Sequence, residues 1–171
     1  YPDWWEGRRF DTCTSWIVAG PTNEPTRDVC QFALVGGMIE GTKEPDGTGW
    51  IPKRCIGDVN FRQCGVQNVI DTVKVKHVSG GWSELAFKSY EQGNIKFQGV
   101  SRHGVWLDEE PTDQMIFTEA QTRTIDKKGM VLFTRTPLFG MSDVIRHFVD
   151  GGPGIYYATA TWQDAPHLDE G

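Results

Sequence analysis

Residues 104–111 read Gly-Val-Trp-Leu-Asp-Glu-Glu-Pro, so an apolar run is followed at once by three acids and a proline. Such a run predicts a buried strand of an α/β sheet, with Asp108 and Glu109 at its C-terminal tip. Ligands of open α/β sheets bind just beyond the carboxyl ends of the strands. The octet therefore indicates a candidate site, although an Asp-Glu pair after a strand is more often a solvated turn.

The composition is that of one folded domain of ordinary size. The chain has 171 residues, of which 38% are hydrophobic and 23% charged, and its 20 glycines predict many turns. A net charge of -6 argues against a domain that wraps nucleic acid through a basic face. No apolar run is long enough to span a membrane, and no leader peptide is recognised. Because the first residue is Tyr1 rather than methionine, a fragment is expected.

The cysteine pattern does not predict a metal centre. The four cysteines form no Cys-x-x-Cys pair and have no histidine at zinc-ligand spacing: Cys13, Cys30, Cys55 and Cys64. They are expected to be free thiols of a protein in a reducing compartment.

Strand and helix patterns alternate along most of the chain. Strands are expected at residues 15–20, 71–78, 82–87, 104–108, 130–133 and 155–161, and helices at 29–35, 114–123 and 143–148. The Gly-Gly turn near residue 80 joins residues 71–87 into a β-hairpin. Residues 51–64 are expected to hold a short helix. The alternation predicts an α/β fold: a mainly parallel sheet with helices on both faces and a hairpin insertion.

Two neighbouring strand ends carry polar side chains. The strand at 104–108 ends in the acids at 108–110, and the strand at 130–133 is followed by Thr134-Arg135-Thr136. Because parallel strands joined by one helix end at the same edge, the hydroxyls of Thr134 and Thr136 should lie near the carboxylates. Nucleotide hydrolysis requires a metal ligand, a base or water-orienting group, and a polar group that senses the γ-phosphate. These two strand ends supply candidates for all three roles; the other reading of the threonines is that they simply end a strand.

An ordered set of short motifs extends over most of the chain and resembles the ATPase domain of tailed-phage terminase large subunits, the DNA-packaging motors. These motifs are Trp4-Trp5-Glu6-Gly7-Arg8-Arg9-Phe10, Ala19-Gly20-Pro21-Thr22-Asn23-Glu24, Ser89-Tyr90-Glu91-Gln92-Gly93, Phe97-Gln98-Gly99, Trp106-Leu107-Asp108-Glu109-Glu110-Pro111 and Thr134-Arg135-Thr136-Pro137-Leu138. The resemblance implies a P-loop NTPase-like fold with ATP and Mg²⁺ as ligands.

The resemblance also implies roles for the residues at the strand ends. Asp108 would be the Mg²⁺-binding Walker B aspartate and Glu109 the catalytic glutamate, with Glu110 as second choice for the base. Thr134 and Thr136 would belong to the motif that couples hydrolysis to DNA movement. The implied partners are viral double-stranded DNA, the portal, the small terminase subunit and further copies of the chain in a ring on the portal. The implied location is the host-cell cytoplasm.

The sequence departs from the family pattern in three ways. No Gly-x-x-x-x-Gly-Lys-Ser/Thr loop is present, and residues 36–43, Gly-Gly-Met-Ile-Glu-Gly-Thr-Lys, are interpreted as a helix end and loop. The family's nuclease domain is also missing, and Arg135 stands where a small or apolar residue is expected; it could reach a phosphate or pair with a nearby acid. Residues 1–171 are therefore expected to be a partial ATPase domain that binds and hydrolyses ATP poorly when alone. Its tail from about 163 is expected to be poorly structured or to lead to an absent domain.

Two other classes of function remain open from the sequence. One is a non-enzymatic α/β fragment or accessory module that binds a partner, through aromatic residues such as Trp4, Trp5 and Trp82. The other is a metal-dependent nuclease that uses the acids at 108–110, although nuclease sites gather acids from several strands and no second acidic strand end is found.

Overall fold

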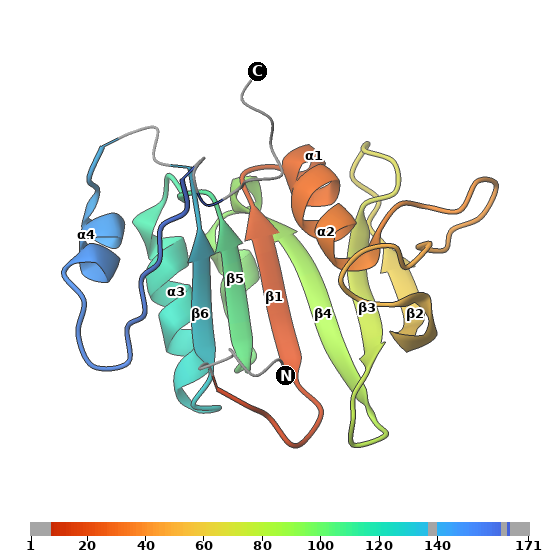
Figure 1. Ribbon diagram of the computed structural model, residues 1–171. Coiled ribbons are helices and arrows are strands. Elements are labelled where there is room, and N and C mark those ends of the chain that lie inside the picture. Colours follow the sequence, from red (N-terminus) through yellow and green to blue (C-terminus); the bar gives the residue numbers. More distant parts are fainter. Residues whose placement is uncertain (1–7, 137–139, 162–163, 165–171) are drawn as a thin grey trace. The chain divides into compact units, whose positions relative to one another are not determined.

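The structure is a computed structural model that describes residues 8–136, 140–161 and 164 (Figure 1). It divides the chain into two compact units, residues 1–136 and residues 137–171. The first unit holds the sheet and the candidate site. The second holds the helix α4 (Asp143–Val149), whose first turn is capped because the Ser142 hydroxyl accepts a hydrogen bond from the Ile145 N–H at 3.2 Å.

A six-stranded sheet forms the centre of the first unit, in the order β2-β3-β4-β1-β5-β6. Its strands are β1 (Ser15–Gly20), β2 (Ile56–Phe61), β3 (Ile70–Lys76), β4 (Trp82–Ser89), β5 (Gly104–Asp108) and β6 (Met130–Thr134). Strands β4, β1, β5 and β6 are parallel, while β2, β3 and β4 form an antiparallel meander. The predicted α/β fold with a mainly parallel sheet and a hairpin is confirmed.

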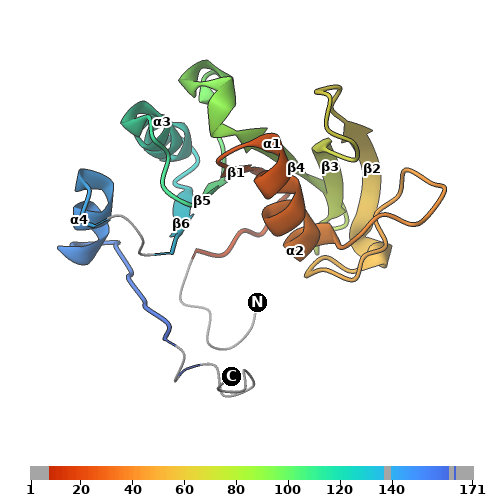
Figure 2. The same ribbon diagram turned by 90° about the horizontal axis from the view of Figure 1, so that it is seen from above.

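The helices lie on opposite faces of this sheet, as predicted (Figure 2). One continuous helical segment runs through α1 (Asn23–Pro25), a π-helical stretch (Thr26–Gln31) and α2 (Phe32–Val35), and α3 (Gln114–Ile125) covers the other face. Two 3₁₀ turns, Tyr90–Gln92 and Asn94–Phe97, lie on the α3 side. Gly36 ends α2 with φ of 80° and donates its N–H to the Phe32 carbonyl, so the helix-end interpretation of residues 36–43 is confirmed.

Two predicted elements differ from the structure. Residues 51–64 hold a 3₁₀ turn (Lys53–Cys55) followed by strand β2, rather than a short helix. Gly57 and the polar residues of β2 weaken the strand pattern, and β2 is an edge strand whose register with β3 shifts twice. Residues 155–161 carry no strand: they are mostly exposed in the second unit and pair with no other described segment.

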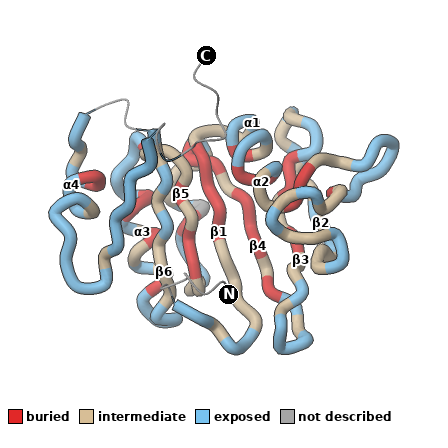
Figure 3. Tube along the Cα trace, in the orientation of Figure 1, coloured by how far each residue is buried: buried red, intermediate tan, exposed pale blue. Residues whose placement is uncertain are grey.

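Buried residues are concentrated in the central strands and in parts of the helices (Figure 3), and the core has a layer on each side of the sheet. On the α2 side, Val18, Leu85 and Phe87 from the strands pack with Cys30 and Val35 from the helix. On the α3 side, the strand and helix residues that face the interior are fully or almost fully buried: Ile17, Ala19, Val105, Leu107, Ile116, Phe117 and Ala120. Burial of β1 and β5 on both faces explains why their sequences are continuous apolar runs.

His103 fastens the amino end of β5 to that of β1. The Ser15 N–H donates to His103 Nδ1 at 3.1 Å, and the His103 N–H donates to the Ser15 carbonyl at 2.8 Å. The Phe10 ring lies edge-on to the imidazole, with centroids 5.4 Å apart. Burial lowers the pKa of His103, and the positive charges of Lys127 and Arg8 lower it further. The folded chain therefore favours the neutral imidazole, which can accept the Ser15 hydrogen bond.

The free energy of unfolding is expected to fall as the pH is lowered from about 7.5 to about 5.5. A histidine whose folded pKa is depressed contributes stability that is present above its unfolded pKa of about 6.5 and is lost as the pH falls through the folded pKa. Urea unfolding at the two pH values measures the difference. His103→Asn keeps an acceptor near Nδ1 without titrating, so its difference should be smaller; an equal difference in both proteins would contradict this role.

Candidate functional site at the carboxyl ends of β5 and β6

The acids and threonines predicted to form a site meet at the carboxyl edge of the sheet. Asp108 is the last residue of β5, and it lies directly opposite Thr134, the last residue of β6, in the parallel ladder. The helical segment that follows β1 lies on one face of the sheet, whereas α3, which follows β5, lies on the other (Figure 2). Such a switch between neighbouring strands opens a crevice beyond their carboxyl ends, where ligands of α/β proteins bind.

Asp108 is half-buried and held by a short hydrogen bond. The Thr134 hydroxyl donates to Asp108 Oδ1 at 2.6 Å, and the same hydroxyl oxygen accepts from the indole N–H of Trp106 at 2.7 Å. Cys30, from the helix on the α2 side, also lies beside this carboxylate. Burial raises the pKa of the Cys30 thiol to about 12, helped by the negative charge of Asp108 and by a hydrogen bond to it. Cys30 is therefore a neutral donor next to the carboxylate.

Glu109 has a backbone conformation that is rare for a residue with a side chain. Its φ is 60°, in the left-handed region. Its N–H donates to the Thr134 carbonyl at 2.8 Å, and its carboxylate accepts from Thr136 twice, from the hydroxyl at 3.0 Å and from the N–H at 3.3 Å. A conformation of this kind persists only when the surrounding structure enforces it, and such residues cluster at functional sites. The β6 end thus fixes both the backbone and the side chain of Glu109.

Tyr90 supports the turn at Asp108 and Glu109 by contacting its backbone, a role that the sequence did not indicate. Its buried hydroxyl lies 2.8 Å from the Asp108 carbonyl oxygen, 2.9 Å from that of Glu109 and 3.3 Å from that of Ala19. The single hydroxyl proton is shared among these acceptors. Burial raises the pKa of Tyr90, and the nearby negative charge of Asp108 adds to the effect, so the hydroxyl stays protonated and can donate. The sequence signal was its place in the motif Ser89-Tyr90-Glu91-Gln92-Gly93, to which no role was assigned.

Tyr90→Phe is expected to destabilise the chain by about 1–3 kcal/mol, because it leaves buried carbonyl oxygens without their donor. The loss should be local as well as global, so amide hydrogen exchange at Glu109 should accelerate. Urea unfolding and exchange measured by NMR test both effects. Tyr156→Phe is the matched control, since Tyr156 is 80% exposed and its hydroxyl is solvated. Unchanged stability and exchange in Tyr90→Phe would contradict the supporting role.

Two further residues of the predicted site are less tightly held. Glu110 is half-buried, and within the described ranges its side chain makes no hydrogen bond or ion pair. The same holds for Arg135, which lies between the two threonines, so pairing of this arginine with a nearby acid is not observed among the residues described. The tight contacts involve Asp108, bound to Thr134 at the end of β6, and Glu109, bound to Thr136 just after it.

The donor set suits a magnesium ion that is shared with phosphates. In the part of the chain that the structure describes, no group of three or more His, Cys, Asp and Glu side chains could hold a metal ion. Magnesium commonly keeps several waters and takes one or two carboxylates together with substrate phosphate oxygens. Asp108, with the Thr134 hydroxyl beside it, could supply the protein's share of such a shell.

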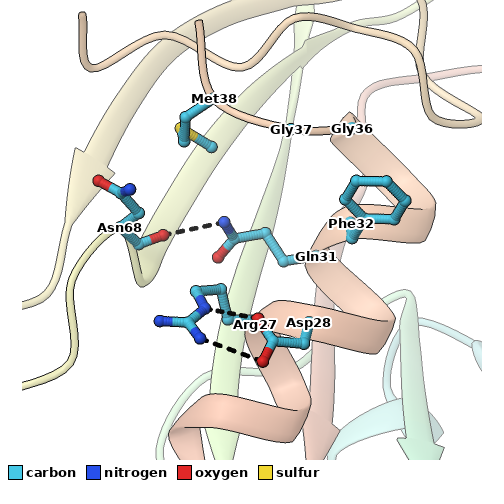
Figure 4. Close-up of a pocket in the computed structure, with 8 residues that line it drawn as sticks. All are labelled: Arg27, Asp28, Gln31, Phe32, Gly36, Gly37, Met38 and Asn68. Carbon is cyan, nitrogen blue, oxygen red and sulfur yellow. Dashed lines mark hydrogen bonds and ion pairs between the residues drawn. The ribbon is translucent and has the colours of Figure 1, made fainter. Parts of the chain in front are cut away.

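A shallow hollow of about 470 Å³ lies elsewhere, between the helical segment and the start of β3 (Figure 4). The polar side chains that the helical segment contributes to it are already paired within the chain. Arg27 forms an ion pair with Asp28 at 2.7 Å, and the Gln31 amide bridges the Asn68 carbonyl and the Ile70 N–H at 2.9 Å each. The Gln31 bonds fasten the helix to β3, so the hollow has a structural explanation that does not involve a ligand.

Other residues singled out in the sequence lie away from the site or outside the described residues. All four cysteines are free thiols. Trp82 is 46% exposed, and the Lys76 ammonium lies 4.9 Å from its ring centroid. Trp4, Trp5 and the tail from residue 163, apart from Asp164, fall outside the described residues. No helix among the residues described has the length and apolar character required to cross a membrane.

Comparisons with known proteins find a matching family and a related sequence. The family described as "Terminase large subunit, T4likevirus-type, N-terminal" matches residues 15–171. The "Terminase, large subunit" of Salmonella phage P22 is 39% identical over 151 residues, which are 85% of this chain and 29% of that protein. The chain thus spans less than a third of that relative.

A solved structure shows the same fold. The large terminase from the thermophilic bacteriophage D6E, in complex with ADP, matches with a TM-score of 0.60 over 92% of this chain and 35% of that one. At 13% identity this likeness shows the α/β fold alone.

Proposed function

This chain belongs to the family of terminase large subunits, within their N-terminal region, and we propose that it forms part of the ATPase that drives viral double-stranded DNA into a procapsid. The observation that supports this function best is the double contact at the carboxyl edge, Asp108 with Thr134 and Glu109 with Thr136. It brings two acids and two hydroxyls together at the carboxyl edge of the sheet, next to the switch between β1 and β5.

In this proposal Asp108 binds Mg²⁺ and Glu109 orients and activates the attacking water. Phosphoryl transfer depends mainly on positioning and charge stabilisation, so a base whose position is fixed is what the reaction requires. Glu109 meets this condition because Thr136 and the left-handed turn hold it. Glu110 follows outside the turn without such contacts and is the weaker candidate for the base. ATP with Mg²⁺ is the proposed substrate; the D6E relative was solved in complex with ADP.

We assign the coupling of hydrolysis to DNA movement to Thr134, the last residue of β6, and to Thr136, which follows the strand. Each threonine binds one carboxylate at the end of β5, so a change in charge or ligand at Asp108 or Glu109 alters the hydrogen bonds that hold the end of β6. Double-stranded DNA, the portal, the small terminase subunit and further copies of the chain are the proposed partners.

Thr136→Val tests the coupling role in a large subunit that contains this chain. Valine keeps the branched shape and the N–H bond to Glu109 but removes the hydroxyl bond at 3.0 Å. We expect the rate of ATP hydrolysis to fall by no more than about tenfold, consistent with the loss of one hydrogen bond to a charged group. The rate of DNA packaging should fall more than the rate of hydrolysis, so that less DNA is packaged per ATP. Simultaneous ATPase and DNA-packaging assays measure the ratio. Thr136→Ser restores the hydroxyl and should behave as wild type; equal losses in both activities would contradict coupling through Thr136.

A further inference from the structure

Trp106 reaches the carboxylate site through Thr134. It lies two residues before Asp108, so the two side chains are on the same face of β5. Thr134 lies opposite Asp108 on β6 and is therefore the diagonal neighbour of Trp106. The indole N–H donates to Thr134 Oγ1 at 2.7 Å, and the Thr134 hydroxyl donates to Asp108 Oδ1 at 2.6 Å.

The donor and acceptor in each of these two hydrogen bonds follow from the groups involved. An indole N–H can only donate, and a threonine hydroxyl has one proton and two lone pairs. Because Trp106 occupies a lone pair of Thr134 Oγ1, the one hydroxyl proton is available for Asp108. The resulting bond has an ionised acceptor, and such bonds are shorter and stronger than neutral ones. Without the indole N–H, the hydroxyl would be able to rotate toward water.

Trp50 holds the indole of Trp106 in place. The two rings stack with centroids 6.0 Å apart and an angle of 19° between their planes. The backbone at Trp50 is itself anchored, since its N–H donates to the Ala33 carbonyl at 2.9 Å and the next N–H, of Ile51, donates to the Leu34 carbonyl at 2.8 Å. The end of the helix on the α2 side thus fixes the plane from which the indole donates.

We infer that Trp106 is a positioning residue of the site: it keeps the Thr134 hydroxyl as a donor to Asp108, so that the carboxylate is oriented before metal and nucleotide arrive. This inference rests on the proposed metal-binding role of Asp108. Pre-orientation lowers the cost of ordering a ligand at the moment of binding. Loss of the indole N–H should therefore weaken metal binding without removing any group that touches the metal.

The hydrogen bond itself is tested by NMR on the ¹⁵N-labelled chain. The Trp106 indole N–H resonance is assigned by its disappearance in Trp106→Phe. Thr134→Val should shift this resonance upfield because the acceptor is lost, and Thr134→Ser should leave it near its wild-type position. Trp82→Phe, at a partly exposed tryptophan away from the site, is the control for general effects of replacing a tryptophan and should leave the Trp106 indole resonance in place. An indole resonance that does not move in Thr134→Val overturns the inference.

The positioning role is tested by titrating the same chain with MnCl₂. The paramagnetic ion should broaden the resonances of Trp106 and of the Glu109 amide, and Asp108→Asn should abolish the broadening. In Trp106→Phe, the Mn²⁺ concentration that broadens the Glu109 amide should rise roughly threefold to tenfold. If wild type shows no broadening, the metal role of Asp108 fails. If wild type broadens and Trp106→Phe responds at the same concentration, only the positioning role fails.

Discussion

Glu109→Gln in a large terminase subunit that contains this chain is expected to lower the rate of ATP hydrolysis by about 10²–10⁴-fold while nucleotide binding is retained. Glutamine has nearly the same shape, and its carbonyl oxygen can still accept from the Thr136 hydroxyl and N–H, so the turn should survive. What is lost is the basic carboxylate that activates water. Single-turnover hydrolysis separates this chemical step from binding and product release.

Glu110→Gln is the matched control for this prediction. It makes the same chemical change one residue further along, at a side chain without hydrogen bonds among the described residues. Its effect on hydrolysis should stay within about fivefold, the size expected for a surface substitution that removes no specific contact. A large loss in Glu110→Gln together with a small loss in Glu109→Gln would reverse the assignment of the base.

Asp108→Asn is expected to lower hydrolysis by roughly 10²–10³-fold, because a metal ligand contributes several kcal/mol of charge stabilisation in the transition state. Asparagine keeps an oxygen that can accept from Thr134, so the fold around the strand end should persist. In contrast to Glu109→Gln, this substitution should also weaken Mg²⁺-dependent nucleotide binding. Binding of a fluorescent nucleotide, measured with and without Mg²⁺, distinguishes the two variants.

A change of metal tests whether Asp108 contacts the ion. Asp108→Cys replaces the carboxylate by a thiolate, which prefers softer metals to Mg²⁺. Hydrolysis by this variant should therefore recover in part when Mn²⁺ or Cd²⁺ replaces Mg²⁺, and Glu109→Gln should show no such recovery. An equal loss of activity with every metal would mean that Asp108 does not contact the ion.

The parts of the fold that the sequence predicted correctly are those with a strong periodic signal. Strands β1, β5 and β6 are short apolar runs, and each is a strand in the structure. The sequence also predicted that the acids lie close to the threonines, because the carboxyl ends of parallel strands joined by one helix lie at the same edge of the sheet. Strand β2 was missed because Gly57 and Asn60 weaken the alternation, and residues 155–161 have the composition of a strand but no partner to pair with.

The contacts that position the site could not be predicted from the sequence alone. Trp106 was assigned to an apolar run and to a family motif but given no role, because the partner of its indole N–H depends on the register between β5 and β6. The left-handed backbone at Glu109 was not predicted, because this conformation usually falls on glycine and the position holds a glutamate. Tyr90 reaches three carbonyl oxygens that are separated from it by up to 71 positions in the chain. Such contacts follow from the assembled sheet and not from local pattern.

The most direct test of the proposed ATPase site is to locate the bound metal in a crystal of a large subunit that contains this chain. Crystals grown with ADP, Mn²⁺ and a γ-phosphate mimic would reveal the ion by its anomalous scattering. We predict Mn²⁺ bound to the Asp108 carboxylate, directly or through one water, with the γ-phosphate mimic facing Glu109. A metal–nucleotide complex bound away from these two side chains, for example in the hollow beside Phe32, would contradict the account.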